Sequence, residues 1–289
     1  MNVLLVTNNN KDVDFSFSRD VIEYLKAKGV TLYSDEKELI NDFNVLEFDN
    51  QEIDFSVVIG GDGTVLKYAS KYGKKDFPFV GINLGRVGAL TLIDKENYKL
   101  YLDKVLEHDY YIEERMGLDC VVNFKESEKS LEFTGYNDII LHRGLSMKLL
   151  PVITKINDSK EDVIFADGVV VATPNGSSAY NVSAGGPLLS VNSKCYVVTP
   201  ICPQSRIFTS LVISENDKVY LSISEKSSLN KNEITISGDG FYNSFVSSGD
   251  KISIKKSDKG LKMIKFNESD SLYQAAHKAL NSIKKKGEK

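Results

Sequence analysis

The sequence predicts an α/β domain with a parallel sheet, followed by a β-rich domain and a C-terminal helix. In residues 1–109, short apolar runs alternate with stretches of helical periodicity, which is typical of a parallel α/β sheet. In residues 110–266, helical periodicity fades and short β-rich runs recur, which indicates an antiparallel domain. Residues 267–289 return to a helical pattern and end in a basic tail. We therefore expect a domain boundary near Tyr110.

The first domain contains three strand candidates, at residues 3–6, 57–59 and 79–82. A helix is predicted for FSRDVIEYLKAKG, because its apolar residues recur at helical spacing and a glycine ends it. A further helix is expected within residues 95–109. Ligands of such sheets bind beyond the carboxyl ends of the strands, and both glycine clusters, GGDGT and GINLGRVGALT, fall at such ends.

The second domain is predicted from a series of short apolar runs, and the last helix from a capped helical pattern. The runs are LDCVVNF, YNDIILHR, DVIFADGVVVATP, KCYVVTP, KVYLSIS, NEITIS and KISIKKS. Ser269 or Asp270 is a suitable N-cap for the C-terminal helix.

Composition and charge limit the class of partner. The chain has 289 residues, of which 42% are hydrophobic, so it can form one large or two medium domains. Its net charge is −4 and its sequence pI is near 5.6, so we expect neither a nucleic-acid nor a membrane partner. The N-terminal apolar run is too short for a signal peptide or a membrane span.

Neither the cysteines nor the histidines have the spacing of a metal site. The cysteines are Cys120, Cys195 and Cys202, and the histidines are His108, His142 and His277. The cysteines are odd in number and lack a CxxC motif, so neither a disulfide framework nor a zinc site is expected. A reducing cytoplasmic location fits this cysteine content, and we interpret the histidines as structural or surface residues.

The segment FSVVIGGDGTVLKYA places bare glycine backbone beside one carboxylate, that of Asp62. Adjacent glycines allow a sharp turn and bring N–H groups against a ligand, and a turn from a strand into a helix favours an anion. A carboxylate beside phosphate must accept a proton or hold a metal, and both are roles in phosphoryl transfer. The alternative is a plain strand-to-helix turn with Asp62 as the helix cap. These residues alone leave both interpretations open.

In a second glycine-rich segment, ADGVVVATPNGSSAYNVSAGGP, the apolar run VVVAT leads into a stretch of small residues. Its small residues permit the close approach of a flat ligand, and Tyr180, its only aromatic residue, can stack on a base. The alternative is a glycine-rich connection within a β domain.

With these motifs the chain resembles the NAD kinases. Four pieces match in order, GGDGT, GINLGRVGALT, YND and DGVVVATPNGSSAYNVSAGGP, and the last is close to unique to that family. The resemblance implies transfer of a phosphoryl group from ATP, or from polyphosphate in some members, to the 2′-hydroxyl of the adenosine ribose of NAD, which gives NADP. It also implies an active site in the cleft between the domains, in a homodimer or homotetramer with shared sites.

The resemblance also assigns residues to roles. By position, Asp62 would activate the hydroxyl and Gly63 would lie against the nucleotide. Asn137 and Asp138 match the pair that reads the adenine and the ribose, and Asp167 matches the acidic residue that begins the long motif. The nucleotide-contacting part of that motif corresponds to Ser178, Ala179, Tyr180, Asn181, Val182 and Ser183.

Other assignments are less specific. Lys67 and Lys148 stand where the family can place further polar contacts, or they are solvated surface residues. The implied cofactor is Mg²⁺ or another divalent cation, which neutralises the donor phosphates. Asp62 could act as the base or help to hold this metal, and one sequence does not separate the two roles. The metal ligands are therefore unassigned.

Several positions depart from the family pattern. Ala89 replaces the usual phenylalanine, the usual TPTGST reads TPNGSS with Asn175 and Ser178, and CPHSL reads CPQSR with Gln204. The later Arg-Pro is absent, and Thr209 with Ser210 stands in that region. Ala89 puts substrate affinity and donor choice in doubt, since it removes an aromatic wall.

Two other functions are compatible with parts of the pattern. A lipid kinase of the diacylglycerol kinase type would use the same GGDGT turn but place an asparagine and a glutamate directly after it, where this chain has VLKYA. A non-catalytic NAD-binding sensor would keep the pocket and lack turnover.

Overall fold

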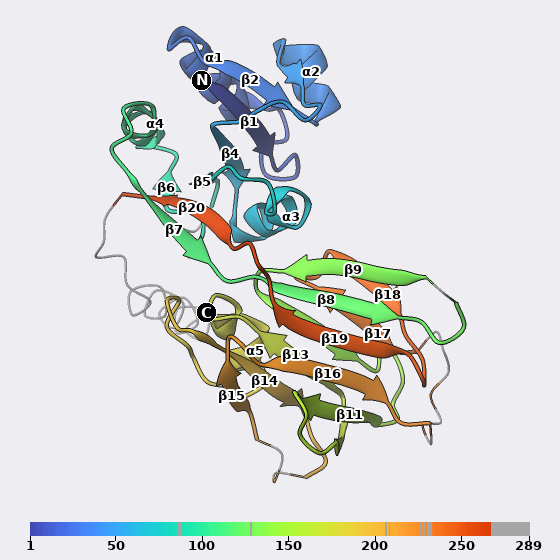
Figure 1. The fold of residues 1–289 in the computed structure, drawn as a ribbon. Helices are drawn as coiled ribbons and strands as arrows, with labels where there is room; N and C mark the ends of the chain where they lie inside the picture. The colour runs from blue at the N-terminus through green and yellow to red at the C-terminus, as the bar shows by residue number, and fades with distance from the viewer. Residues whose placement is uncertain are drawn as a thin grey trace, which may run out of the picture. The chain divides into compact units, whose positions relative to one another are not determined.

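The computed structural model describes residues 1–85, 88–127, 129–205, 207, 209–225, 227, 229 and 233–266, and the chain forms two compact units (Figure 1). The first unit holds Met1–Glu114 and takes up the chain again from Leu261, and the second holds Arg115–Gly260.

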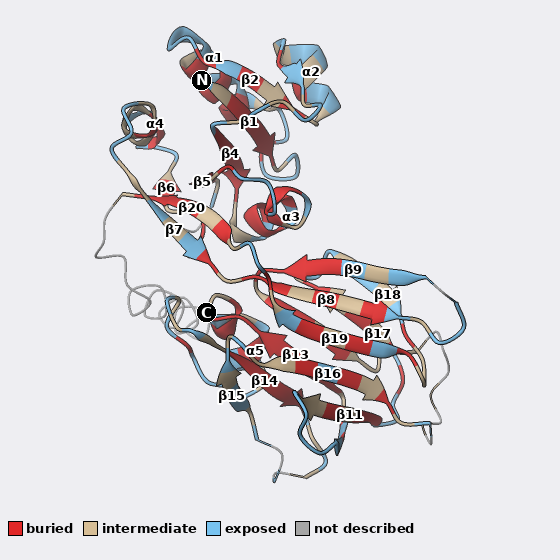
Figure 2. Cartoon of the chain, viewed as in Figure 1, coloured by how far each residue is buried: buried red, intermediate tan, exposed pale blue. Residues whose placement is uncertain are grey.

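The first unit is built on a mainly parallel sheet with the order β3-β2-β1-β4-β5-β20-β7, and β6 pairs with β5. Its strands are β1 (Asn2–Thr7), β2 (Thr31–Ser34), β3 (Leu46–Glu47), β4 (Phe55–Gly60), β5 (Phe79–Asn83), β6 (Ile93–Asp94), β7 (Tyr111–Arg115) and β20 (Leu261–Lys265). Strands β1, β4 and β5 run parallel to one another, and every residue of β4 and β5 is buried (Figure 2). Burial on both faces explains why these strands read as continuous apolar runs. The prediction of a parallel α/β domain is confirmed.

Four helices accompany this sheet in the described part of the unit. They are α1 (Ser16–Ala27), α2 (Lys37–Phe43), α3 (Asp62–Tyr72) and α4 (Tyr98–Leu106). Helix α1 buries Val21, Ile22 and Leu25, which pack in one hydrophobic cluster with apolar residues of β1, β4 and β5. The helix expected within residues 95–109 is α4, with Asn97 at its N-cap.

The assignment of residues 261–266 to the β-rich domain is wrong. Strand β20 pairs in parallel with β5, with Met263 opposite Phe79, and therefore belongs to the first sheet. The boundary between the two units lies after Glu114, whereas the sequence predicted it near Tyr110. The run LKMIK has the same local pattern as a strand of the second unit, so only the long-range pairing distinguishes the two.

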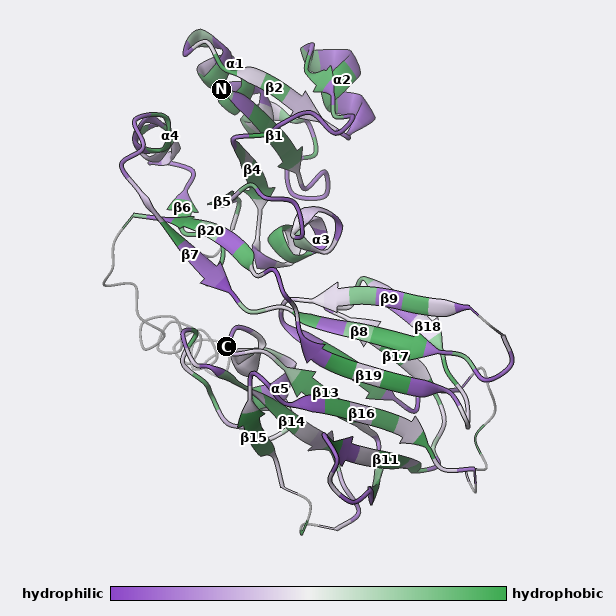
Figure 3. Cartoon of the chain, in the orientation of Figure 1, coloured by the Kyte–Doolittle hydropathy of each residue, from purple (hydrophilic) through white to green (hydrophobic). Residues whose placement is uncertain are grey.

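The second unit contains two antiparallel sheets, each with six strands among the described residues, with the orders β15-β14-β13-β10-β17-β18 and β12-β11-β16-β19-β8-β9. The strands of the first are β10 (Asp138–His142), β13 (Gly168–Ala172), β14 (Cys195–Ile201), β15 (Leu211–Ser214), β17 (Thr235–Gly238) and β18 (Tyr242–Phe245). Those of the second are β8 (Leu118–Asn123), β9 (Ser130–Gly135), β11 (Leu150–Ile156), β12 (Asp162–Ala166), β16 (Lys218–Ile223) and β19 (Lys251–Lys256). One hydrophobic cluster joins side chains of both sheets, so the unit is a β-sandwich. Apolar and polar residues alternate along β19 (Figure 3).

Strand β13 is buried on both faces and positions the long glycine-rich segment. Val169 and Val171 enter the core of the sandwich, whereas Val170 and Ala172 pack in a second cluster with Leu189. Ala184 of the glycine-rich segment packs against the same cluster, so this segment covers part of the outer face of the sheet. This burial explains the unbroken apolar run VVVA.

The predicted C-terminal helix with Ser269 or Asp270 as its cap, and the basic tail, lie outside the described residues. In the part of the chain that the structure covers, no helix has the length and hydropathy that a membrane crossing requires.

Candidate functional site

The turn GGDGT joins the end of β4 to the start of α3, as the sequence predicts. Gly61 is the N-cap, and the Thr64 side chain accepts the Gly61 N–H at 3.3 Å. A β-carbon on Gly60 would lie 2.4 Å from Thr64 Oγ1, so this position requires glycine. A β-carbon on Gly63 would meet nothing within 4 Å, so the turn is open on that side.

The Asp62 carboxylate binds the second glycine cluster. Its Oδ1 accepts the N–H groups of Leu90 and Thr91 at 3.1 and 3.0 Å and the Thr91 hydroxyl at 3.0 Å. Its Oδ2 accepts the Ala89 N–H at 2.8 Å. A β-carbon on Gly88 would lie 2.0 Å from Oδ1, which explains the glycine there. The interpretation of Asp62 as the helix cap is wrong, because Gly61 is the cap and the carboxylate bonds to residues 89–91.

Ala89 lacks the aromatic ring of the phenylalanine that is usual at this position, but its main chain still bonds to Asp62. Its N–H donates to Asp62, and its carbonyl accepts a hydrogen bond from Lys265 Nζ at 3.2 Å. Lys265 is buried on β20, so the pairing that the sequence did not predict supports the loop beside Asp62.

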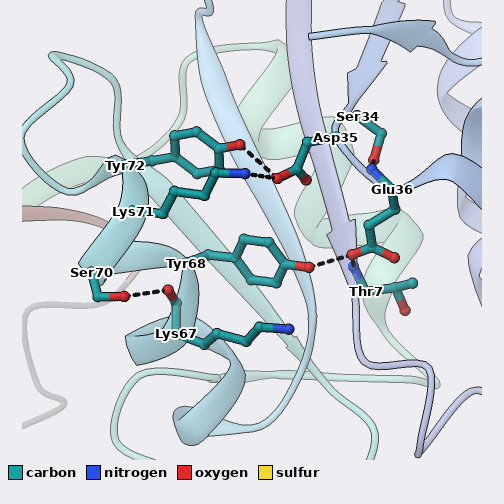
Figure 4. Close-up of polar contacts among 9 residues, drawn as sticks. All are labelled: Thr7, Ser34, Asp35, Glu36, Lys67, Tyr68, Ser70, Lys71 and Tyr72. Atoms are coloured by element: carbon teal, nitrogen blue, oxygen red, sulfur yellow. Dashed lines mark hydrogen bonds and ion pairs between the residues drawn. The ribbon is translucent and has the colours of Figure 1, made fainter. Parts of the chain in front are cut away.

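Two acidic residues after β2 anchor α3 (Figure 4). The Tyr68 hydroxyl donates to Glu36 Oε1 at 2.5 Å, and the Tyr72 hydroxyl donates to Asp35 Oδ2 at 2.7 Å. The Thr7 N–H, at the end of β1, also donates to Glu36 Oε1, at 2.8 Å. Burial raises the pKa of Glu36 and of Tyr68, and it raises the pKa of Tyr72 to about 12. The sequence analysis did not identify this cluster, although the acidic pair after a strand and the i, i+4 tyrosines were visible.

Lys67 lies on the exposed side of α3, with its Nζ 5.3 Å from the centroid of the Tyr68 ring (Figure 4). Its contact with a nucleotide stays a prediction.

In the second unit, Asp239 holds the YND segment. Its carboxylate accepts the N–H groups of Tyr136 and Asn137 at 2.7 Å each, and that of Asp138 at 3.0 Å. Asp239 has a φ of 51°, in the left-handed region that aspartate tolerates better than most residues. The sequence analysis did not single out Asp239, although its GDG context is a turn signal.

Asn137 is oriented by Asn175, one of the positions that depart from the family pattern. The Asn175 Nδ2 donates to Asn137 Oδ1 at 2.5 Å, and Arg115 donates to Asn175 Oδ1 at 3.0 Å. A β-carbon on Gly176 would lie 2.0 Å from the Asn137 carbonyl oxygen, so the long motif packs directly against this residue. Within the described residues the Asn137 amide nitrogen donates no hydrogen bond, so it can bind a ligand.

Asp138 is a buried carboxyl group, 5% exposed, and its oxygens have no hydrogen-bond partner in the described part of the chain. Burial and the charge of Asp239 raise its pKa to about 7. Burial also raises the pKa of Asp239, while its three N–H donors act to lower it. With a pKa of about 7, Asp138 can both donate to and accept from a ligand hydroxyl near neutral pH.

The predicted contact residues of the long motif divide into two groups. Ser178, Tyr180, Val182 and Ser183 are exposed, and Ala179 is half-buried. Asn181 is fully buried, and its amide donates to Ser177 O at 3.1 Å and Pro187 O at 2.9 Å. Its Oδ1 accepts the Thr199 hydroxyl at 2.7 Å. These internal bonds use both ends of the Asn181 amide, and a contact of this residue with the nucleotide stays a prediction.

Asp167 lies directly before β13 and forms an ion pair with Arg143, whose Nε is 2.7 Å from Asp167 Oδ1. The Arg143 N–H also donates to the Asp167 carbonyl oxygen at 3.0 Å. The sequence analysis did not identify Arg143, which directly follows β10. Lys148 is exposed in the loop after Arg143, and its predicted role stays a prediction.

Two family descriptions match the chain: ATP-NAD kinase N-terminal domain over residues 3–110, and ATP-NAD kinase C-terminal domain over residues 136–266. The chain belongs to the NAD kinase family. The resemblance predicted from GGDGT and the long motif is thereby confirmed.

Curated NAD kinases match over nearly the whole chain. The NAD kinase of Caldanaerobacter subterraneus subsp. tengcongensis is 33% identical over 271 residues, which cover 92% of this chain and 94% of that protein. The NAD kinase of Lachnoclostridium phytofermentans is 31% identical over 265 residues, covering 91% and 93%.

Solved NAD kinase structures share the fold. A yeast NADH kinase in complex with NADH matches with a TM-score of 0.84 and 26% identity, covering 97% of this chain and 87% of that chain. An NAD kinase from Archaeoglobus fulgidus in complex with ATP matches with a TM-score of 0.74 and 27% identity, covering 96% and 99%.

Proposed function

We propose that this NAD kinase family member transfers the terminal phosphoryl group of ATP to the 2′-hydroxyl of the adenosine ribose of NAD. The bond from the γ-phosphorus to the β,γ-bridging oxygen breaks, a bond from the 2′-oxygen to phosphorus forms, and ADP leaves. The observation that carries the proposal is the Asp62 carboxylate held by two glycine motifs at the start of α3. An oriented carboxylate beside N–H groups suited to phosphate combines a proton acceptor with an anion site.

Asp62 is the proton acceptor in this proposal. Its Oδ1 accepts three hydrogen bonds, whereas its Oδ2 accepts one among the described residues, so Oδ2 keeps a lone pair for the 2′-hydroxyl proton. The bonds to residues 89–91 fix the orientation of the carboxylate, and a fixed base needs less reorganisation during transfer.

In the same proposal, NAD recognition falls to residues of the second unit. Asn137 offers a free amide nitrogen, and Asp138 offers a carboxyl group that donates or accepts near neutral pH. The exposed Tyr180 ring can stack on a base, and the hydroxyls of Ser178 and Ser183 can bind the ribose or a phosphate.

We assign Mg²⁺ to the donor phosphates rather than to a protein cage. No cluster of three or more His, Cys, Asp or Glu side chains lies together in the described portions of the chain. Mg²⁺ usually keeps several waters and binds substrate phosphates with at most one or two carboxylates, so this assignment needs no cage of protein ligands. When bound, the ion neutralises charge on the donor phosphates.

An assay for NADP tests the reaction. Purified protein is incubated with NAD, ATP and Mg²⁺, and NADP is read by an NADP-specific dehydrogenase. Parallel reactions replace ATP by polyphosphate and NAD by NADH, and a further one omits the metal. NAD binding without NADP formation with any donor would support the sensor alternative instead.

Replacing Tyr180 by alanine should weaken NAD binding about tenfold, because one aromatic contact is worth about 1–2 kcal/mol. Titration calorimetry with NAD measures the change. Tyr220→Ala is the matched control, since Tyr220 is 38% exposed on β16 and Tyr180 is 39% exposed. An unchanged NAD dissociation constant with a lower melting temperature would show that Tyr180 only packs.

A homo-oligomer is supported by apolar side chains on edge strands of the second unit. Val163 and Phe165 on β12 are 40% and 47% exposed, and Leu211 and Val212 on β15 are each 51% exposed. Exposed apolar edge strands favour pairing with another chain. We include a homodimer or homotetramer with shared active sites in the proposal, and a cytosolic location, which suits the three free cysteines.

Complementation tests the shared site. If Asp62 and Asp167 of different subunits complete one site, a mixed dimer of Asp62→Asn and Asp167→Asn subunits holds one intact site. It should then show about half of the wild-type activity per dimer, while each single mutant stays near zero. NADP formation is measured on tag-selected mixed dimers, with their stoichiometry checked by mass. Activity no higher than that of the single mutants would exclude a shared site and leave the kinase proposal standing.

A further inference from the structure

We propose that Lys11 supplies the cationic side chain that binds the donor phosphates at the GGDGT turn. The inference rests on the proposed use of ATP and adds a residue that lies outside the glycine motifs. It concerns the loop between β1 and α1, which contains the sequence NNNKD.

The Lys11 ammonium group lies against both glycine clusters. Its Nζ is 2.9 Å from the point that a β-carbon on Gly61 would occupy, and 3.9 Å from the equivalent point on Gly85. These glycines lie just after the ends of β4 and β5, where an α/β sheet binds its ligands. A lysine 49 residues before GGDGT in the chain thus places a positive charge beside that turn.

The backbone that carries Lys11 is held on both sides. Before it, the Asn8 N–H donates to the Ile59 carbonyl oxygen at 2.9 Å, and the Asn8 side chain donates to Thr64 Oγ1 at 3.0 Å. The Lys11 N–H donates to the Asn8 carbonyl oxygen at 2.8 Å, which closes a turn. The loop is therefore tied to β4 and to the first turn of α3.

After Lys11, the buried Asp12 carboxylate accepts the Phe17 N–H at 3.1 Å and the Ser18 N–H at 2.8 Å. These bonds fix the loop to the start of α1. The Asp12 carboxylate therefore bonds to the start of α1 and not to the neighbouring Lys11.

Among the described residues, no acidic group forms an ion pair with the Lys11 ammonium. The exposed Lys11 side chain makes no hydrogen bond or ion pair with any residue in the described ranges, and the Asp62 carboxylate is bound to residues 89–91. An unpaired cation beside glycine backbone and a helix N-terminus matches a polyphosphate group in charge and in geometry. In a chain with a net charge of −4, a local cation of this kind favours the binding of an anionic donor.

The test compares Lys11→Met with Lys11→Arg and with the control Lys37→Met. Lys37 is an exposed lysine at the start of α2 in the same unit, so the control removes the same charge from the same unit. Binding of a non-hydrolysable ATP analogue, of AMP and of inorganic tripolyphosphate is measured by calorimetry. KM for ATP and for NAD is measured in the NADP assay.

Lys11→Met should weaken binding of the ATP analogue and of tripolyphosphate by roughly 10- to 100-fold, the usual effect of one lost charge-assisted hydrogen bond. Affinity for AMP and KM for NAD should not change. Lys11→Arg should keep most of the affinity, and Lys37→Met should match the wild type.

Two results would overturn the inference: affinity of Lys11→Met for the ATP analogue within twofold of the wild type, or an equal loss for AMP and the analogue with a lowered melting temperature. The tripolyphosphate titration separates this inference from the proposed reaction. If the wild type binds tripolyphosphate and Lys11→Met does not, the role of Lys11 stands even where no NADP forms. If the wild type binds neither probe, the inference fails.

Discussion

Replacing Asp62 by asparagine is expected to lower the turnover number about a hundredfold or more, the usual scale for loss of a general base. Asparagine has the same shape but cannot take the proton of the 2′-hydroxyl. The amide nitrogen also cannot accept an N–H, so at least one bond to residues 89–91 is lost. The turnover number is measured by the NADP assay, and the dissociation constant for NAD by calorimetry should stay close to the wild-type value.

Gly88→Ala is the companion variant, because it disturbs Asp62 without changing its chemistry. A β-carbon there would lie 2.0 Å from Asp62 Oδ1, so the carboxylate or the loop must move. We expect a similarly large loss of turnover with the carboxylate intact, since small displacements of a catalytic group are costly. Turnover of Asp62→Asn within a few-fold of the wild type would contradict the role of Asp62 as the base.

Asp138→Asn is expected to stabilise the ligand-free protein at alkaline pH and to weaken NAD binding. The pKa of Asp138 is raised to about 7 by burial and by Asp239, whereas an unfolded aspartate titrates near 4. Between about pH 4 and pH 7, Asp138 binds more protons in the folded protein than in the unfolded protein. Its titration therefore makes folding less favourable as the pH rises. Asparagine carries no charge, so its advantage should grow by about 2–3 kcal/mol between pH 5 and pH 8.

Urea unfolding at several pH values measures this difference, with Asp158→Asn as the control. Asp158 is an exposed aspartate of the same unit, so its replacement should leave the pH dependence unchanged. A constant stability difference between Asp138→Asn and the wild type across this range would contradict the raised pKa. If Asp138→Asn were less stable than the wild type at high pH and also bound NAD more weakly, Asp138 would be charged in the folded protein.

The β4–α3 turn was predictable because its causes are local. The apolar run before GGDGT forms a buried strand, and the glycines allow a turn that a β-carbon at Gly60 would block. The functional pairing of Asp62 was not predictable, because its partners are 27 to 29 residues away in the chain. The sequence alone was also compatible with Asp62 as the cap of the following helix.

In the long motif, composition indicated a ligand-binding segment but not the direction of each side chain. Tyr180 is exposed, whereas its neighbour Asn181 is buried and bonded to Ser177, Pro187 and Thr199. A four-residue helix directs adjacent side chains to different sides, and only packing decides which side faces solvent.

The sequence by itself determined the properties that depend on neighbouring residues: the α/β and β-rich character of the two parts, the strands β1, β4 and β5 of the first sheet, the glycine turn, and the motifs of the NAD kinase family. The tertiary structure alone decided the properties that depend on residues far apart in the chain. These are the return of β20 to the first sheet, the bonds of Asp62 to residues 89–91, the support of YND by Asp239, and the position of Lys11. The physical reason is that hydrophobic periodicity and backbone freedom act over a few residues, whereas hydrogen bonds between distant segments form only after the sheets bring them together.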